Sequence, residues 1–363
     1  MESILNIVHT LSSKSFEGRR AGSQGGKRAN NFIEEQLRSL KAETLPGYES
    51  YSHDLNDEKG QIYGQNILGV ISGQGELKNE YLLVEAHYDH LGLDEDSGQY
   101  FPGANDNAAA VAVVLHAGEK YRMLTKALPS CRSLILAFFD AEEPPFFNSD
   151  KMGVMKFCKT PPLPLDAIKT GIFLDLLGHP SIPCKILEKG VFAAGGEKSG
   201  YSDAIDTNYD DTNCHFHRVG IHSIPPSGNY LAFKNLNKSF LFLTSGRSAH
   251  YHDISDSAEK LDYPKLTHIS ERLSRLLRDI STIEDDKFQY NIKSQDDKTS
   301  VSTLRKIIQC IDINSVDEEL NFNEISEVLR KADSQIEASG TLNDFERSKL
   351  TYILGVLEKN IRI

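Results

Sequence analysis

The sequence predicts an α/β protein in which helices cover both faces of a mixed, mainly parallel central sheet. Two observations lead to this prediction. Short apolar runs bounded by glycine and polar residues alternate along the chain with stretches of helical spacing, and such alternation is typical of a sheet sandwiched between helices. Several of the runs are also apolar without interruption, as expected for strands that are buried on both faces.

The predicted elements follow one another from the N-terminus. Residues 1 to about 60 are expected to be helical and polar, with glycines that interrupt an early basic loop. Strands bounded by turn residues come next, and an alanine- and valine-rich helix is expected over 107–122. The predicted strands span residues 65–71, 81–86, 133–139, 170–174 and 239–243.

The character of the sequence changes beyond about residue 285. A charged, hydrophilic connection is followed by three amphipathic segments near 300–312, 322–333 and 343–360, with no further strand pattern. We therefore predict one domain over residues 1–285 and a helical C-terminal extension over 286–363. Residues 312–317 begin like a calcium loop, but they lack its central glycine and closing glutamate, so an ordinary helix-capping turn is expected there.

Composition and charge argue against several classes of protein. Hydrophobic residues make up 39% and charged residues 25% of the 363 residues, which is ordinary for a soluble globular protein. The net charge of -12 argues against nucleic-acid binding, because such proteins need a broad basic face to neutralise phosphates. No apolar run approaches the roughly 20 residues that cross a bilayer.

The N-terminus and the cysteines indicate a reducing compartment. Met1–His9 lacks the basic start and the long apolar stretch of a secretory signal, so a cytoplasmic protein is expected, or a secreted or periplasmic one if a leader has been trimmed. The five cysteines are scattered and form no CxxC pair, so we predict buried thiols rather than disulfides or a thiolate metal site. They are Cys131, Cys158, Cys184, Cys214 and Cys310.

Side chains that commonly bind metals follow the ends of the predicted strands. Ligands of open α/β sheets bind at the carboxyl edge of the strands, so these side chains are expected to meet in one crevice. Two imidazoles and three carboxylates suit zinc better than calcium or magnesium, which seldom bind histidine. The candidate metal ligands are His87, Asp106, Glu143, Asp175 and His252.

Each of these features has an ordinary structural explanation when it is taken alone. A His-x-Asp at a strand end is commonly a satisfied polar pair, and an aspartate between two asparagines is commonly a turn or a helix cap. Paired glutamates are usually solvated, but Glu142 and Glu143 follow the apolar run 133–139. Burying carboxylates there costs free energy unless a cation is present, and the joint order of the segments favours a metal site.

Five segments, in this order, resemble the motif series of the M28 family of metallopeptidases. Together with landmarks at 17–23, 65–70 and 259–263, the resemblance covers roughly residues 10 to 280. It implies a zinc-dependent exopeptidase, most readily an aminopeptidase that removes N-terminal residues from peptide substrates, with 1–285 as its catalytic domain. The segments are 86–92 (AHYDHLG), 102–107 (PGANDN), 140–144 (DAEEP), 174–178 (LDLLG) and 251–257 (YHDISDS).

The resemblance also implies a role for each site residue. Two zinc ions per chain would share Asp106 as a bridging ligand, and the peptide bond between Asp106 and Asn107 would be cis. One ion would be held by His87 and Asp175, and the other by Glu143 and His252. His250 competes with His252 for the last position, but the motif favours the histidine directly after Tyr251.

Three further residues are implied in catalysis. Glu142 would be the general base, taking a proton from the metal-bridging water and delivering it to the leaving amine. Asp89 would orient the imidazole of His87 and fix its tautomer. Tyr251 would either donate a hydrogen bond to the oxyanion or serve only in packing.

Three other functions remain open at this point. Relatives with one zinc cyclise N-terminal glutamine, but they rely on tryptophan and on an aspartate–histidine pair before the last strand. This chain has no tryptophan, and Ser227-Gly228-Asn229-Tyr230 occupies that place. A non-catalytic binding module would usually have lost ligands that are intact here, and a deacetylase or carboxypeptidase would use the same metal chemistry with a different pocket.

Overall fold

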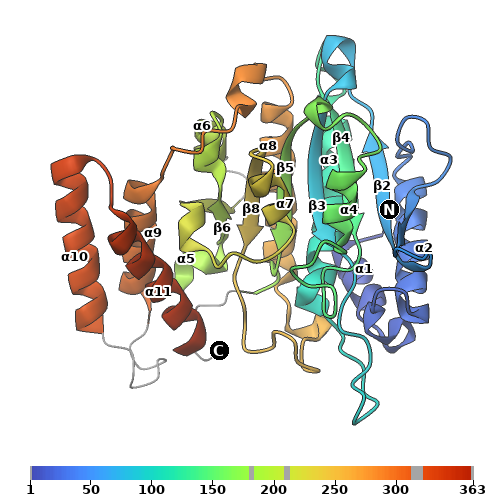
Figure 1. Ribbon diagram of the computed structural model, residues 1–363, viewed down its shortest axis with the longest axis horizontal. Helices are drawn as coiled ribbons and strands as arrows, with labels where there is room; N and C mark the ends of the chain where they lie inside the picture. The colour runs from blue at the N-terminus through green and yellow to red at the C-terminus, as the bar shows by residue number, and fades with distance from the viewer. Residues whose placement is uncertain (1, 180–183, 208–212, 312–321, 361–363) are drawn as a thin grey trace.

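The computed structural model describes residues 2–179, 184–207, 213–311 and 322–360, and it confirms a mixed α/β sheet flanked by helices (Figure 1). The sheet has eight strands in the order β1-β2-β4-β3-β5-β8-β6-β7. Its four central strands, β4, β3, β5 and β8, are parallel to one another. The neighbours on either side, β2 and β6, pair with them in antiparallel fashion.

The strands and helices have the following bounds. The strands are β1 Ser52–Asn56, β2 Ile62–Ile71, β3 Tyr81–His87, β4 Ser133–Phe139, β5 Ile168–Asp175, β6 Gly190–Ala194, β7 His215–Val219 and β8 Ser239–Thr244. The helices are α1 Ile4–Leu11, α2 Gln24–Ser39, α3 Ala109–Thr125, α4 Gly153–Lys159, α5 Lys185–Glu188, α6 Ser202–Asp206, α7 Tyr230–Asn235, α8 Tyr263–Ile280, α9 Asp297–Cys310, α10 Phe322–Ser339 and α11 Asp344–Asn360.

Two apolar layers, one on each face of the sheet, explain the uninterrupted apolar runs. Successive side chains of a strand point to opposite faces, so Leu134, Leu136 and Phe138 of β4 join one layer with α1, α2, α3 and α8. Ile135 and Ala137 join the other layer with α4, α7 and α9 to α11. Both sides of β4 are therefore covered, and each fully buried leucine, isoleucine or phenylalanine contributes roughly 1.5–3 kcal/mol to the stability.

The structure differs from the sequence-based expectations in three places. A strand, β1, lies within the N-terminal 60 residues that were expected to be helical, and it pairs with β2 at the edge of the sheet. The predicted helix 107–122 begins at Ala109, after an irregular turn over Ala104–Ala108. All five thiols are free, but Cys310 is exposed and Cys158 is half-buried, so the prediction of buried thiols was wrong for these two.

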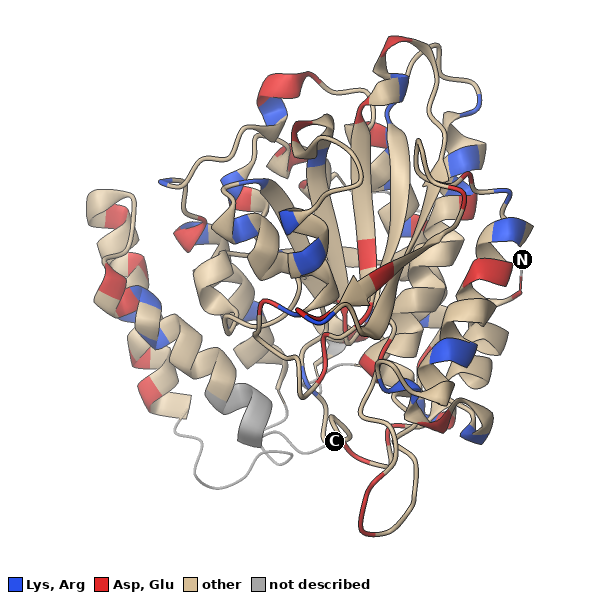
Figure 2. Ribbon diagram, turned by 45° about the vertical axis from the view of Figure 1, so that its right-hand side comes forward, with Lys and Arg blue, Asp and Glu red and all other residues tan. Residues whose placement is uncertain are grey.

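The C-terminal extension consists of α9, α10 and α11, as predicted from three amphipathic segments. These helices share the second apolar layer with strands β6 and β8. The calcium-loop-like segment 312–317 lies outside the described residues. No helix of the described chain is long and apolar enough to span a bilayer, and Lys and Arg alternate with Asp and Glu over the coloured ribbon of Figure 2 rather than forming a basic face.

Candidate metal centre

Strand pairing brings the predicted ligands to one edge of the sheet. His87 is the last residue of β3 and Asp175 the last residue of β5, and these two strands are parallel neighbours. Glu142 and Glu143 follow β4, which pairs with β3 on its other side. Because parallel strands end at the same edge, side chains from three segments enter one crevice.

Asp106 lies between the two histidines that were predicted as ligands. Its Oδ1 is 3.4 Å from His87 Nε2, and its Oδ2 is 3.3 Å from His252 Nε2. On the far sides, His87 Nε2 is 3.6 Å from Asp175 Oδ1, and His252 Nε2 is 3.2 Å from Glu143 Oε2. The five residues thus form two groups that meet at Asp106, and the peptide bond from Asp106 to Asn107 is cis.

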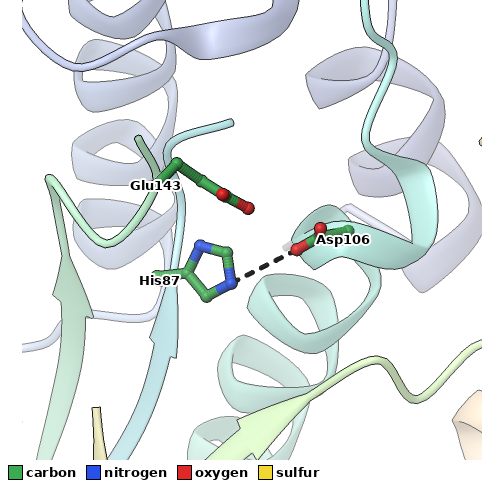
Figure 3. Close-up of side chains that lie close together, drawn as sticks. All are labelled: His87, Asp106 and Glu143. Carbon is green, nitrogen blue, oxygen red and sulfur yellow. Dashed lines mark ion pairs between the residues drawn. The ribbon is translucent and has the colours of Figure 1, made fainter. Parts of the chain in front are cut away.

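Three of these side chains approach one another closely enough to share an ion. His87, Asp106 and Glu143 are buried, and each offers a ligand atom within 4.8 Å of the others. Figure 3 shows them converging from the end of β3, the turn before α3 and the loop after β4. His250 instead places its Nδ1 2.7 Å from Ser255 Oγ, so the structure brings His252 rather than His250 to the site.

Buried polar atoms without hydrogen bonds mark the same place. Among the described residues, Asp106 Oδ2, Asp175 Oδ1 and both ring nitrogens of His90 have no hydrogen-bond partner of good geometry. Unsatisfied buried polar atoms cost free energy and call for an explanation such as a bound ion. The donor set of imidazoles and carboxylates therefore fits a cation.

The two adjacent glutamates lie in opposite electrostatic surroundings. Burial raises the pKa of Glu142 well above its usual value, and the nearby carboxylates Asp175 and Glu85 act in the same direction. Burial and the neighbouring Asp106 carboxylate act on Glu143 in the same direction, but the close imidazoles of His252 and His90 outweigh them and lower the pKa of that carboxyl. Neighbouring carboxyls with pKa values pushed apart are a mark of separate chemical roles.

Asp89 contacts both His87 and the loop that carries the paired glutamates. His87 Nδ1 lies 3.3 Å from the Asp89 carbonyl oxygen and 3.7 Å from its Oδ1. The Asp89 carboxylate also accepts hydrogen bonds from the backbone N–H groups of Glu142 and Glu143 at 3.2 and 3.1 Å. Asp89 therefore positions three site residues, whereas the sequence analysis predicted that it would orient only His87.

Asp256 positions Asp106 through hydrogen bonds with the backbone. Its carboxylate accepts hydrogen bonds from the backbone N–H of Asn105 at 2.9 Å and of Asp106 at 3.0 Å. Burial raises the pKa of Asp256 to about 6. Asp256 belongs to the segment 251–257 that carries the family resemblance, but its function depends on a loop contact that the sequence does not reveal.

Arg19 ties together three loops behind the site. It is fully buried, and its Nε donates a hydrogen bond to the Tyr88 carbonyl at 2.9 Å. Its two terminal nitrogens donate to the carbonyl groups of Leu11, Pro102 and Gly103 at 2.7–2.8 Å. Burial lowers the pKa of Arg19 to about 10 against the opposing effect of Asp106, so the guanidinium stays charged at neutral pH.

Replacing Arg19 with methionine is expected to destabilise the protein by about 3–5 kcal/mol, because several buried carbonyl groups would lose their donors. Chemical denaturation of the wild type and the variant would measure the change. Arg20 offers a matched control, since it is the neighbouring arginine and its side chain is 46% exposed. An effect of Arg19→Met no larger than that of Arg20→Met would contradict this role.

Strained backbone accompanies the site residues. Ala141 before Glu142, Leu176 after Asp175, and His252 itself have φ values of 59°, 54° and 57°. Non-glycine residues rarely adopt this left-handed conformation, which costs of order 1–3 kcal/mol and persists where surrounding structure enforces it. These left-handed conformations therefore occur at His252 itself and directly beside Glu142 and Asp175.

His90 is a close neighbour of the predicted ligands, and the sequence analysis did not single it out. Its Nδ1 lies 3.6 Å from Glu143 Oε1 and 3.8 Å from Asp106 Oδ2. Its ring meets that of His252 edge-on, with the centroids 5.9 Å apart. The segment 86–92 contained His90, but its spacing gave no reason to prefer it as a ligand.

A pocket opens at the predicted ligands, and His87, Asp106, Glu143 and Asp175 line it. Its polar lining includes Glu142 and Tyr251, which stacks on His252 with the ring centroids 3.8 Å apart. The guanidinium carbon of Arg247 lies 4.6 Å from the centroid of the Tyr251 ring. The apolar lining comes from Phe147, Leu176, Phe192, Ile224, Pro225, Phe242 and Leu354.

Comparison with protein families gives the affiliation of the chain. The family model described as peptidase family M28 matches residues 66–277, which is more than half of the 363 residues. The chain belongs to peptidase family M28. All five predicted ligands and Glu142 lie inside the matched M28 region, whereas α9, α10 and α11 lie beyond it.

Comparison with individual proteins gives matches of low identity or short span. The chain is 32% identical over 119 residues to the uncharacterized protein YfbL of Escherichia coli, and the match spans 32% of this chain and 35% of that protein. A glutaminyl cyclase from Porphyromonas gingivalis is 18% identical, with 77% of this chain and 97% of that chain covered and a TM-score of 0.57. A Zn-dependent exopeptidase from Parabacteroides distasonis is 19% identical, with the same coverage and a TM-score of 0.56. At these identities the two structures establish the shared fold.

Proposed function

We propose that this M28 peptidase is a zinc-dependent aminopeptidase that releases N-terminal residues from peptides. The observation that carries the proposal is the division between Glu142 and Glu143. Both glutamates line the pocket, but Glu143 Oε2 lies 3.2 Å from His252 Nε2, whereas Glu142 Oε2 lies 4.0 Å from His87 Nε2. This difference supports Glu143 as a metal ligand and Glu142 as the general base.

Two zinc ions would be held by the five predicted ligands. His87, Asp106 and Asp175 would hold one ion, and Asp106, Glu143 and His252 the other. The support is the geometry of Asp106, whose two oxygens face different histidines at 3.4 and 3.3 Å. Bound zinc would polarise the scissile carbonyl and lower the pKa of water at the site.

Glu142 moves the proton in the proposed reaction. As a carboxylate it takes a proton from the attacking water, and it then delivers that proton to the departing amine when the peptide bond breaks. Burial favours its neutral form, which makes the carboxylate a stronger base for the first of these transfers. Tyr251 lines the pocket beside these groups, where its hydroxyl would donate a hydrogen bond to the carbonyl oxygen as negative charge develops.

The lining of the pocket supports an N-terminal apolar residue as substrate. A free ammonium group is attracted by carboxylates, and Glu142 and Asp175 both line the pocket. The aromatic and aliphatic lining residues bury an apolar side chain favourably, at roughly 25 cal/mol per Å² of apolar surface. Peptides that begin with leucine or phenylalanine are therefore the proposed substrates.

Cyclisation of N-terminal glutamine is the second candidate, favoured by the fold shared with the Porphyromonas gingivalis glutaminyl cyclase. Two differences from the cyclising relatives weigh against it. The chain contains no tryptophan, and Gly228 and Asn229 stand where those relatives have an aspartate–histidine pair. Gly228 lies next to Glu142, where a Cβ would come 3.2 Å from Glu142 Oε1. Asn229 donates a hydrogen bond to buried Glu85 at 2.8 Å and does not line the pocket.

A panel of substrates tests the proposal. The zinc-loaded protein is expected to hydrolyse leucyl and phenylalanyl arylamides, and to be inactive on the same compounds with acetylated amino groups, because the ammonium contact is lost. A glutaminyl peptide in the same assay tests the second candidate through loss of ammonia. Ammonia release without arylamide hydrolysis would establish the cyclase instead, and cleavage of the acetylated compounds would contradict an aminopeptidase.

A further inference from the structure

The C-terminal extension reaches the pocket of the candidate metal centre. Leu354 and Gly355 of α11 line it together with His87 and Glu142, although α11 lies beyond the region 66–277 that the family model matches. In Figure 1, α11 (dark red) runs from α10 back toward the sheet and descends to the lower end of the molecule.

A buried carboxylate fixes the start of α11. Asp297, at the first position of α9, is 3% exposed and accepts hydrogen bonds from Arg347 Nε at 2.8 Å and Nη2 at 2.9 Å. The same carboxylate accepts hydrogen bonds from the Leu342 backbone N–H and the Thr341 hydroxyl. Paired charge-assisted bonds of this kind give orientation as well as attraction, so α11 leaves the turn in a defined direction.

Further along, α11 is attached to the rim of the pocket. Thr351 Oγ1 donates a hydrogen bond to the His222 carbonyl, in the turn Ile221–Ser223 that precedes the pocket residues Ile224 and Pro225. Leu350, Ile353 and Leu354 are buried in the second apolar layer. Tyr352, in contrast, is 70% exposed, so the helix has one face toward the domain and one toward solvent.

Gly355 lines the pocket without a side chain of its own. A Cβ added there would meet no atom within 4 Å. A side chain introduced at this position would therefore start beside the pocket without a clash at its Cβ. Its neighbour Leu354 contributes apolar surface to the same cavity.

We infer that α11 forms a wall of the substrate pocket, and that Leu354 and Gly355 set how large an N-terminal side chain the enzyme accepts. This inference rests on the proposed aminopeptidase function. The catalytic groups come from the M28 region, and selectivity for large apolar residues comes in part from the extension.

Selectivity among arylamides tests the wall. In the full-length zinc-loaded protein, Gly355→Leu is expected to lower kcat/KM for leucyl and phenylalanyl arylamides by about 10-fold or more relative to the alanyl compound, because pocket volume discriminates by such factors. Leu354→Ala is expected to shift preference toward phenylalanyl over leucyl. Tyr352→Ala, on the exposed face of the same helix, is the control and is expected to leave the ratios unchanged.

A binding measurement separates failure of the wall from failure of the proposed function. If the wild type hydrolyses the arylamides and Gly355→Leu changes all of them equally or not at all, the wall is wrong and the peptidase stands. If the wild type hydrolyses none of the arylamides, calorimetry measures the binding of free leucine and free alanine to both proteins. Loss of leucine binding but not of alanine binding in Gly355→Leu supports the wall. Equal binding in both proteins, or no binding of either amino acid to the wild type, overturns it.

Discussion

Replacing Glu142 with glutamine is expected to lower kcat for arylamide hydrolysis on the order of 10³-fold. General acid–base catalysis contributes typically 10²–10⁴-fold, and glutamine keeps the size of the side chain while removing the site that accepts the proton. KM is expected to change little, because the shape of the pocket is retained. Steady-state kinetics of the wild type and Glu142→Gln measure the effect.

Zinc content distinguishes a lost base from a damaged metal site. Glu142→Gln is expected to bind as much zinc as the wild type, since the structure directs Glu143, not Glu142, at His252. Asp150→Asn, an exposed carboxylate in the loop that follows the paired glutamates, is the matched control. Full activity in Glu142→Gln, or loss of its zinc, would show that the two glutamates have been assigned the wrong roles.

Replacing Asp106 with alanine is expected to remove both metal binding and activity. Removing a residue that only hydrogen-bonds to a metal ligand typically lowers metal affinity 10–100-fold. Asp106 is itself a proposed ligand, and its carboxylate lies next to both His87 and His252. The zinc affinity of Asp106→Ala is therefore expected to fall by more than about 100-fold. Metal analysis after dialysis, together with arylamide kinetics, measures both effects.

The control for this variant is Asp96→Ala, an exposed aspartate in the loop between β3 and α3. It is expected to keep wild-type zinc content and activity. Circular dichroism of Asp106→Ala is expected to match the wild type, because the helices and strands do not depend on this side chain. If Asp106→Ala kept its zinc and its activity, the shared ligand would have to be another residue.

The central part of the fold was predictable because its strands are buried on both faces. The runs at β4 and β8 are almost entirely apolar, and those at β3 and β5 are mainly apolar although they contain Glu85 and Lys169. β1 was missed because it is an edge strand in which only Leu55 is buried. A strand that covers little apolar surface leaves no pattern that distinguishes it from a polar loop.

The site was predictable to the extent that its residues end strands or belong to motifs. His87 and Asp175 end β3 and β5 in the structure as predicted. Arg19 and Asp256 act through backbone groups of loops distant in the sequence, and no local pattern shows which carbonyl or N–H a buried side chain will reach. The extension was predicted as helical, but the approach of Gly355 to the pocket depends on how α11 packs.

A zinc titration of the metal-free protein tests the central claim most directly. Bound zinc and the rate of leucyl arylamide hydrolysis would be recorded on the same samples as zinc is added back. We predict no hydrolysis without metal, a rate that rises with bound zinc, and saturation at two ions per chain. Hydrolysis by the metal-free protein, or full zinc occupancy without hydrolysis of any aminoacyl amide, would contradict a zinc-dependent aminopeptidase.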